Sequence, residues 1–592
     1  MKKKIILIDK LNLITFIISL IYYKRKVVFF TKTKESQEVF FSKCLIVFRK
    51  SFKFDVVCYD KNPLYYKKIL NATINMTQKN ITRLNVDELI YYTCKLNLYY
   101  GLFKINEVGV FYKEKYDIEY IFINYVNILK NLDYTNSFQK KIKFYTWFNL
   151  KLNDSPESAL SSKSLDKRLK DKVKWLLIFI KVAIVAKKTS FDINILYCSD
   201  RTYAHNKHNN VFKNLNEEKD AFYNFTTNKI FFKKIEYNLY TLHYKSILNY
   251  LFFMIKYYFK YRMFFNKYNT VSLYDQFFLF KNIYFFDRLI KENNIKIVFT
   301  IYEALIATII NHITSKSKKT ISVSSTWSLR YFSSLETDCN KYSDINFVWG
   351  DYQKNIFLKS YDKSKNYIIS GYLGDFATEH FKSESKKYVG MNYIVLYDNI
   401  FHDDFFITQQ QIYEFINITV LFCKKNNLKL VIKTKYEKTF IDYKNLKKII
   451  DDFKDLIILN YTRANLAPVF NAKIVIGISN NTLANIASCL GVPTILYDKF
   501  DLLDKQNISK NCFLAKNIHE LEDKLNLLYT KPSGYKLDKD SRVDPFVDGK
   551  ALNRIYEYIN ELQIYNGTKE EKIDNANFIY QLNYGKDKVI KN

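Results

Sequence analysis

The sequence predicts an α/β protein with two Rossmann-like, doubly wound domains and a helical, aromatic-rich insertion in its N-terminal half. A chain of 592 residues is too long for a single hydrophobic core. Short apolar runs alternate with segments of helical periodicity over 285–324 and again over 393–496, which is typical of parallel sheets. Segment 250–265 differs, because aromatic residues and methionines are interleaved there with basic residues.

Composition and charge narrow the class of protein. With 48% hydrophobic and 26% charged residues the chain reads as globular. The net charge of +33 accompanies a usage rich in Lys, Ile, Asn, Tyr and Phe, which indicates an AT-biased genome. Discounted for that bias, it still predicts a positive field that attracts nucleotides or anionic membrane headgroups. No nucleic-acid-binding motif accompanies the charge, so no nucleic-acid partner is expected.

The eight cysteines are scattered, with no CxxC pair and no histidine at metal-ligand spacing. This argues against a metal site and against a disulfide framework, and it fits a reducing cytoplasm.

The N-terminus allows two interpretations. The apolar stretch after Met1 could be a signal or an anchor, but Asp9 and Lys10 split it, and the uncharged part, 11–23, is too short to span a bilayer. The preferred interpretation is a strand at 5–8, a helix at 11–21 and a strand at 27–31, which would open a Rossmann-like domain. A cytoplasmic protein is therefore expected.

The rest of the N-terminal half gives isolated signals. A strand is expected at 193–198. Segment 250–265 suits a helix lying in a lipid headgroup layer, and equally a core helix whose lysines reach out to solvent. From 285 the pattern is regular: a helix at 287–293 and a helix at 302–314, with strands at 295–300, 320–324, 344–349 and 367–370. Residues 1–375 are therefore expected to form one N-terminal domain with insertions, followed by a linker at 382–387.

A second α/β run predicts a domain over 390–550. Its expected strands are 393–397, 429–432, 456–459, 474–476 and 493–496, and its expected helices are 408–426, 443–453 and 482–490. Residues 551–592 are expected to form a closing helix near 551–562, which returns across the cleft, and a polar tail.

The segment that carries chemistry lies after the expected strand 474–476. The chain turns at Gly477, and four polar residues then occupy the N-terminal end of a helix: Ser479, Asn480, Asn481 and Thr482. Unpaired backbone N–H groups and the helix dipole favour an anion there, so the turn suits a phosphate without a metal. The alternative is ordinary capping of the helix by Ser or Asn.

At these residues the sequence resembles the donor-binding half of GT-B fold glycosyltransferases, and more narrowly the bacterial enzymes of surface, capsular or lipopolysaccharide carbohydrate assembly. The "G-x-S-x-x-T", helix, "G-x-P" order is matched by Gly477, Ser479, Thr482, Gly491 and Pro493, with Ala487 between them. Shorter matches are Trp349-Gly350 after Ser343-Asp344, Gly371-Tyr372, and Lys433-Thr434-Lys435. Together the matches cover roughly 346–498.

The resemblance implies a nucleotide-sugar donor held by this second domain. Lys433 and Lys435, after strand 429–432, would face the donor phosphates; a solvated basic strand end is the alternative. Where many relatives have a glutamate that binds the ribose, this chain has Asn485, which could still donate a hydrogen bond. That departure leaves a UDP-linked or a CMP-linked donor open. Segment 322–327 also lacks the histidine that relatives often have in the corresponding turn.

An inverting transfer would need a general base in the N-terminal domain. The candidates follow expected strands: Asp9, Asp200 and, preferred among the three, Glu303. Each could instead cap the following helix.

The expected function is transfer of a sugar from a nucleotide-activated donor to a surface polysaccharide or lipid-linked glycan, at the inner face of the cell membrane, with no cofactor. Two alternatives stay open. One is a polyol-phosphate transferase with a CDP-linked donor on the same fold. The other is a non-catalytic protein that binds membranes or glycans.

Overall fold

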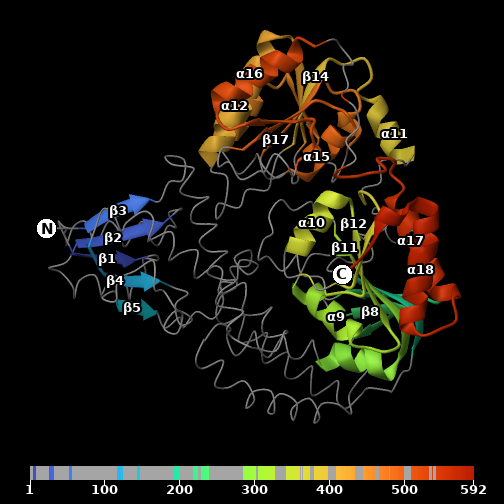
Figure 1. Ribbon diagram of the computed structural model, residues 1–592. Helices are drawn as coiled ribbons and strands as arrows, with labels where there is room; N and C mark the ends of the chain where they lie inside the picture. Colours follow the sequence, from blue (N-terminus) through green and yellow to red (C-terminus); the bar gives the residue numbers. More distant parts are fainter. Residues whose placement is uncertain are drawn as a thin grey trace. The chain divides into compact units, whose positions relative to one another are not determined.

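The computed structural model describes five strands within residues 1–190 and most of the chain after residue 190 (Figure 1). The described residues are 4–8, 26–31, 52–56, 117–123, 143–146, 191–199, 216, 218–224, 229–238, 284–301, 305–326, 342–359, 362, 364–373, 379–397, 409–433, 444–460, 466–478, 481–498, 508–531, 537 and 542–592. Segments 11–21 and 250–265 lie outside them. So does Trp327, the last residue of segment 322–327.

The chain divides into two compact units, residues 1–189 with 238–289, and residues 190–237 with 290–592. The first unit contains a five-stranded parallel sheet in the order β3-β2-β1-β4-β5. Its strands are β1 (Lys4–Ile8), β2 (Lys26–Thr31), β3 (Phe52–Val56), β4 (Asp117–Ile123) and β5 (Lys143–Thr146).

The region expected to be one domain over 1–375 therefore contains two separate sheets. The opening strands β1 and β2 do pair in parallel, with Ile6 opposite Val27. They pair within the five-stranded sheet, whereas β6 to β13 belong to another. Pairing partners distant in sequence decide which sheet a strand joins, and apolar periodicity does not encode them.

The second unit begins with a nine-stranded sheet in the order β20-β13-β12-β11-β10-β6-β7-β8-β9. Six neighbouring strands, from β13 to β7, are parallel, while β20 and β8 are antiparallel to their neighbours. The strands are β6 (Asp192–Ser199), β7 (Ala221–Asn224), β8 (Lys229–Phe232), β9 (Ile235–Asn238), β10 (Asn294–Thr300), β11 (Ile321–Ser325), β12 (Ile345–Val348), β13 (Asn366–Ile369) and β20 (Val589–Lys591).

Helices cover this sheet, and the C-terminal residues supply two of them. Before β10 a helix spans 284–292. The others are α9 (Leu305–Ser315), α10 (Asp351–Lys359), α17 (Ala551–Ile564) and α18 (Lys569–Tyr584). Apolar side chains of α17 and α18, among them Ile559 and Tyr580, pack in one cluster with Ile297, Val323 and Phe347 of the sheet. The segment after residue 550 thus returns to the first of the two domains of this unit.

The tail after residue 566 is ordered. Thr568 and Glu571 form a reciprocal capping box that starts α18, and a short 3-10 turn, η8 (Lys586–Lys588), leads into β20. The sequence predicts a polar tail there and does not predict α18, because the low amphipathicity of this helix hides its few buried residues.

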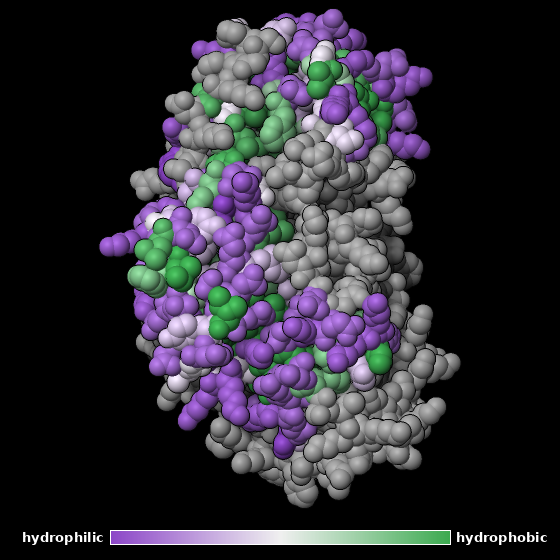
Figure 2. Space-filling view, turned by 90° about the vertical axis from the view of Figure 1, so that its right-hand side faces the viewer, coloured by the Kyte–Doolittle hydropathy of each residue, from purple (hydrophilic) through white to green (hydrophobic). Residues whose placement is uncertain are grey.

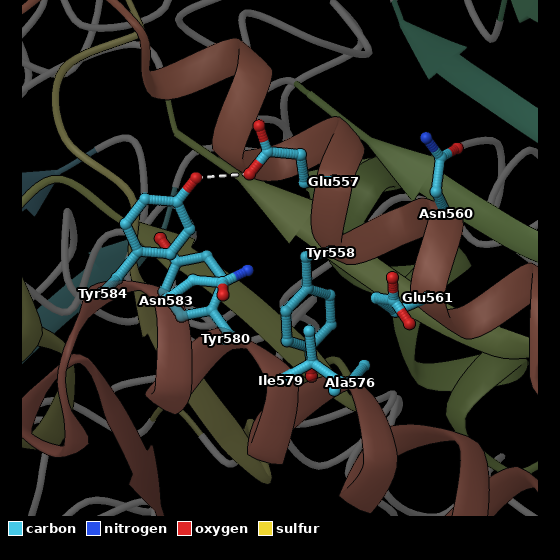
Figure 3. Close-up of a pocket in the computed structure, with 9 residues that line it drawn as sticks. All are labelled: Glu557, Tyr558, Asn560, Glu561, Ala576, Ile579, Tyr580, Asn583 and Tyr584. Carbon is cyan, nitrogen blue, oxygen red and sulfur yellow. Dashed lines mark hydrogen bonds between the residues drawn. The ribbon is translucent and has the colours of Figure 1, made fainter.

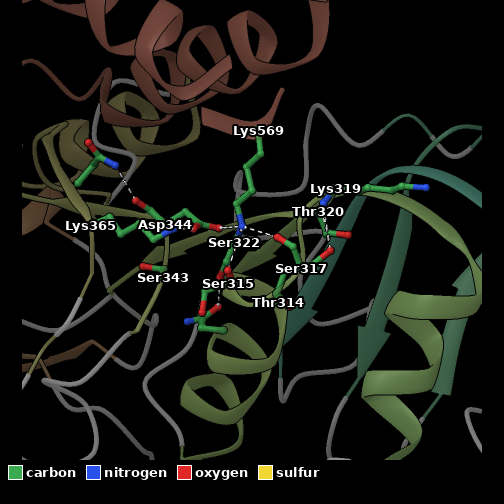
Figure 4. A network of polar contacts seen from close by, with 12 residues as sticks. Thr314, Ser315, Ser317, Lys319, Thr320, Ser322, Ser343, Asp344, Lys365 and Lys569 are labelled. Carbon is green, nitrogen blue, oxygen red and sulfur yellow. Dashed lines mark hydrogen bonds and ion pairs between the residues drawn. The ribbon is translucent and has the colours of Figure 1, made fainter. Parts of the chain in front are cut away.

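A buried lysine anchors α18 to the sheet (Figure 4). Lys569 forms an ion pair with Asp344 at 2.6 Å and donates hydrogen bonds to the backbone carbonyls of Ser315 and Ser317 at 3.2 and 3.0 Å. The Asp344 carboxylate also accepts the Ser322 N–H at 2.9 Å, and Lys365 lies 3.0 Å from its other oxygen. Asp344, which precedes β12, is therefore shared by β11, α18 and Lys365, the residue before β13.

A six-stranded parallel sheet forms the second domain of this unit, in the order β16-β15-β14-β17-β18-β19. Its strands are β14 (Tyr393–Tyr397), β15 (Lys429–Lys433), β16 (Ile457–Asn460), β17 (Ile474–Ile478), β18 (Thr494–Tyr497) and β19 (Cys512–Ala515). Strands β14 to β18 lie within one or two residues of the expected ranges.

Helices lie on both faces of this sheet, as expected of a doubly wound domain. On one face are α12 (Gln409–Lys425), α14 (Lys444–Asp452) and α16 (Ile518–Tyr529), whose apolar residues cluster with Ile394 and Ile476. On the other are α15 (Thr482–Cys489) and the 3-10 turn η6 (Ala467–Val469), clustered with Val395 and Val475. The expected linker at 382–387 largely falls in a helix, α11 (Glu379–Lys386).

The described surface that faces the viewer in Figure 2 is largely hydrophilic, with small separate hydrophobic patches. The largest exposed apolar side chains include Val389, Ile564, Phe578 and Leu582. Among the helices within the described ranges, none combines the length and the apolar character that a membrane crossing requires.

Candidate functional site

The candidate site is built on the carboxyl ends of β14, β15 and β17. Tyr397 is paired with Lys433 of β15 on one side and with Gly477 of β17 on the other. The three residues thus form one row across the edge of the sheet where open α/β folds bind ligands.

Gly477, the next-to-last residue of β17, lets the start of α15 lie against the end of that strand. A Cβ atom at Gly477 would lie 2.7 Å from the Ala484 Cβ and 3.1 Å from the Asn481 Cβ. Only glycine therefore lets the first turn of α15 approach the strand this closely. The N-terminus of the helix consequently lies beside the row of strand ends.

Asn481 is the N-cap of α15. Its side-chain oxygen accepts the Ala484 N–H at 3.0 Å, and the residue is 7% exposed. This hydrogen bond satisfies one of the free donors of the first turn, so Asn481 has the capping role considered as the alternative. Thr482, the first helical residue, is half-buried.

Asn485 is turned into the protein. Its side chain is fully buried; the amide donates to the Asn481 carbonyl at 2.9 Å, and its oxygen accepts from the Cys512 thiol at 3.8 Å. The expected ribose contact would require this side chain to leave both partners. In the structure Asn485 instead fixes the turn that contains Asn481.

Lys433 is a lysine buried to 3% exposure at the end of β15. Because strand residues alternate between faces, it lies on the same side of the sheet as Val431, whose cluster includes Ala484 and Ile486 of α15. Its side chain and α15 therefore share one face at one edge of the sheet. Such a lysine can supply a positive charge to an anion bound at the helix N-terminus.

Two residues that are not among the candidates from the sequence complete the row. Asn460 ends β16 opposite Lys433, and its amide donates to the Tyr388 hydroxyl at 2.7 Å. Burial raises the pKa of Tyr397 well above its ordinary value, so this phenol is neutral. The signal that could have found both was their position at strand ends: Tyr397 is the last residue of the expected strand 393–397, and Asn460 directly follows the expected strand 456–459.

Several candidate residues lie outside the described part of the chain: Asp9, Asp200, Glu303, Lys435, Ser479 and Asn480. The strands before the three candidate bases are described. Asp200 follows β6 directly, and Glu303 follows the end of β10 by three residues; β6 and β10 are parallel neighbours with Thr300 opposite Cys198. Asp9 follows β1, which belongs to the five-stranded sheet of the other unit.

The glycines of the shorter motifs make room for the chain that returns from the second domain. A Cβ at Gly350 would lie 2.5 Å from the Val543 carbonyl oxygen, and Gly371 has a φ of +92°. Trp349, between β12 and Gly350, is fully buried and donates its indole N–H to the Thr326 carbonyl at 2.9 Å. These motif residues therefore have a structural role where the domains connect.

Two charged residues fix the same connection. Arg554 of α17 donates to the Ser370 carbonyl at 2.8 Å, forms a two-bond ion pair with Asp548 and covers the Phe546 ring at 3.7 Å. Asp544 accepts the Tyr372 N–H at 2.9 Å. Burial raises the pKa of Asp544, although its backbone hydrogen bonds and Arg554 oppose that shift. The segment 370–372 and the returning segment 544–554 are thus held together by one cluster, which we call the crossover clamp (Ser370, Tyr372, Asp544, Asp548 and Arg554).

Two Rossmann-like domains with a C-terminal segment that returns to the first define the GT-B class of fold, with the carboxyl ends of the second sheet as the candidate donor site. Neither a protein-family model nor a curated protein matches the sequence. Solved structures similar to the chain include the following three.

A UDP-GlcNAc 2-epimerase from Methanocaldococcus jannaschii, in complex with UDP-GlcNAc and UDP, is 13% identical. The match covers 62% of this chain and 99% of that one, with a TM-score of 0.36. A UDP-forming trehalose-phosphate synthase from Burkholderia xenovorans is 10% identical; the match covers 58% of this chain and 92% of that one, with a TM-score of 0.33. TarM is 15% identical; the match covers 52% of this chain and 56% of that one, with a TM-score of 0.27. The TM-scores are low, so these similarities carry no weight for substrate or reaction.

Proposed function

We propose that the chain is a glycosyltransferase that transfers a sugar from a nucleotide-activated donor to a glycan acceptor. The observation that supports it is a shared position: Lys433 and the N-terminus of α15 lie on one face and at one edge of the six-stranded sheet. A diphosphate or monophosphate placed there would receive backbone N–H groups, the positive end of the helix dipole and the lysine charge.

In the proposed reaction the acceptor hydroxyl oxygen bonds to the anomeric carbon, and the bond from that carbon to the phosphate oxygen breaks. The leaving nucleotide gains negative charge, which Lys433 and α15 would stabilise more strongly as it develops. An inverting transfer also needs a base to take the hydroxyl proton. Asp200 and Glu303 remain our candidates, because both follow neighbouring strands of the nine-stranded sheet.

Thermal-shift titration of the full chain with UDP, GDP, CDP and CMP tests the donor site, since a ligand that binds only the folded state raises the unfolding midpoint. Lys433→Met should weaken binding of the preferred nucleotide by about 10- to 100-fold, the value of a hydrogen bond to a charged group. The matched control is Lys429→Met, on the same strand but exposed. Equal affinity of both variants, or no shift with any nucleotide, would contradict the proposal.

The reaction itself is tested with radiolabelled donors of the preferred nucleotide. Transfer to a glycan acceptor that is lost in Asp200→Asn or Glu303→Gln supports a glycosyltransferase with that base. Turnover of CDP-glycerol or CDP-ribitol without sugar transfer would point to a polyol-phosphate transferase. Conversion of the donor to an epimer without an acceptor, or binding without turnover, would contradict transfer.

The same proposal places the protein at an anionic membrane surface. A net charge of +33 attracts anionic headgroups. Cosedimentation with vesicles containing anionic lipid, falling as salt is raised, is the expected result. Equal sedimentation with neutral vesicles would contradict it.

A further inference from the structure

A small pocket lies between α17 and α18, remote in sequence from the strand ends of the candidate donor site (Figure 3). Its volume is about 190 Å³. Drug-sized ligands fill about 300–1,000 Å³, so this pocket is suited to a smaller group.

The floor of the pocket is aromatic and fixed from below. Tyr580 is buried and donates its hydroxyl to the Ile369 carbonyl at 2.8 Å, and the Tyr558 hydroxyl donates to the Asn577 side chain at 2.7 Å. The Tyr584 ring lies 4.7 Å from the Tyr580 ring, and its hydroxyl donates to Glu557 (Figure 3). Tyr558 and Tyr580 are almost fully buried, so the half-buried Tyr584 ring supplies most of the aromatic surface that a ligand can reach.

The rim is polar and carries both kinds of hydrogen-bonding group. Glu557 and Glu561 lie one turn apart on α17 and supply acceptors, while the amides of Asn560 and Asn583 supply donors as well. Glu557, Asn560 and Asn583 are exposed. An anion would be repelled by the carboxylates, whereas a neutral polyol can use the carboxylates and the amides together.

We propose that this pocket binds one sugar unit of a glycan, as a site separate from the donor site. Sugar hydroxyls donate and accept, which matches carboxylates alternating with amides, and the C–H face of a pyranose ring can pack on the tyrosine floor. The site would hold a glycan chain on the outer side of the α17–α18 hairpin. It extends the proposed function and does not depend on nucleotide binding.

Saturation-transfer difference NMR on the full chain tests the proposal, because this measurement detects weak ligands. The probes are the methyl glycosides of glucose, galactose, mannose and N-acetylglucosamine, with saturating nucleotide present. At least one should receive saturation from the wild-type protein. Asn560→Ala and Asn583→Ala should each reduce that transfer by at least about fivefold, the effect of one lost hydrogen bond.

The matched control is Asn553→Ala, an exposed asparagine of α17 that does not line the pocket. It should leave the signal unchanged, and all three variants should keep the wild-type unfolding midpoint because the substituted side chains are exposed. No transfer to any glycoside, or equal transfer in all four proteins, would overturn the proposal. The nucleotide titration remains a separate readout, so failure here leaves the donor-site proposal standing.

Discussion

At the scale of single residues, the turn before α15 shows how one side chain can support a binding site without touching the ligand. Asn485 donates to the carbonyl of the N-cap residue and is fully buried. That hydrogen bond holds Asn481 in the extended conformation from which its own side chain caps the helix. The first turn of α15 is thereby held in place.

Asn485→Ala should lower the free energy of unfolding by about 1–3 kcal/mol, because the Asn481 carbonyl and the Cys512 thiol lose a buried partner. Nucleotide affinity, measured by titration below the unfolding transition, should fall less than in Lys433→Met. Asn526→Ala, at an exposed position of α16, is the matched control and should change neither quantity. A large loss of affinity with unchanged stability would instead assign Asn485 the ribose contact that the resemblance implied.

At the scale of elements, the crossover clamp connects protonation to stability. Partial burial favours the neutral form of Asp548, but hydrogen bonds from Arg554 and from the Lys550 N–H, and the charges of both residues, outweigh it, so its pKa is lowered. The folded state therefore prefers the ionised carboxylate. Its contribution to stability is present above the unfolded pKa of about 3.9 and is lost as pH falls through the lower folded value.

Asp548→Asn should therefore unfold at a lower temperature than the wild type at neutral pH, and the two midpoints should converge below about pH 4. Differential scanning calorimetry over a pH series measures this. Asp523→Asn, an exposed change on α16, should follow the wild-type curve throughout. A constant difference between Asp548→Asn and the wild type at every pH would show that the carboxylate charge is not the cause.

The anchor of α18 on Asp344 predicts a larger effect. Lys569→Met removes one partner of a buried ion pair, which typically costs about 3–5 kcal/mol. Lys365 still lies beside Asp344, so the lower end is expected. Hydrogen exchange of α18 should become faster, while Lys572→Met, in the same helix, should not change it. Adding Asp344→Asn to Lys569→Met should recover part of the loss; no recovery would argue against an electrostatic cause.

At the scale of the whole molecule, the sequence was sufficient where local periodicity and turn chemistry decide the structure. Strand β14 falls on the expected residues, and β17 and α15 flank the expected polar turn, with β17 extending one residue beyond Gly477. Both signals are carried by a few neighbouring residues. They were enough to predict the fold class and the position of this turn.

What the sequence could not supply was long-range. The separation of β1 from β6 into different sheets depends on partners over a hundred residues away. The inward turn of Asn485 depends on Cys512, and the pocket of α17 and α18 requires the packing of two helices on a sheet that they follow by some two hundred residues. Such contacts leave no trace in the spacing of nearby residues.

The C-terminal segment covers the hydrophobic core of one domain of the second unit more than that of the other. Ile555, Tyr558, Ile559 and Leu562 are buried against the nine-stranded sheet. The cluster between the six-stranded sheet and helices α12, α14 and α16 includes no described residue after Tyr529. Loss of α17 and α18 should therefore expose one core and leave the other covered.

A chain ending at Lys550 should accordingly lose hydrogen-exchange protection in β10 to β13 and keep it in β14 to β18. Each large apolar side chain removed from this face withdraws about 1.5–3 kcal/mol of burial, so several together exceed what a domain can lose. A chain ending at Gly585 keeps both helices and loses only η8 and β20, so it should weaken β13 alone. Equal loss of protection in both sheets would show instead that the two domains unfold as one cooperative unit.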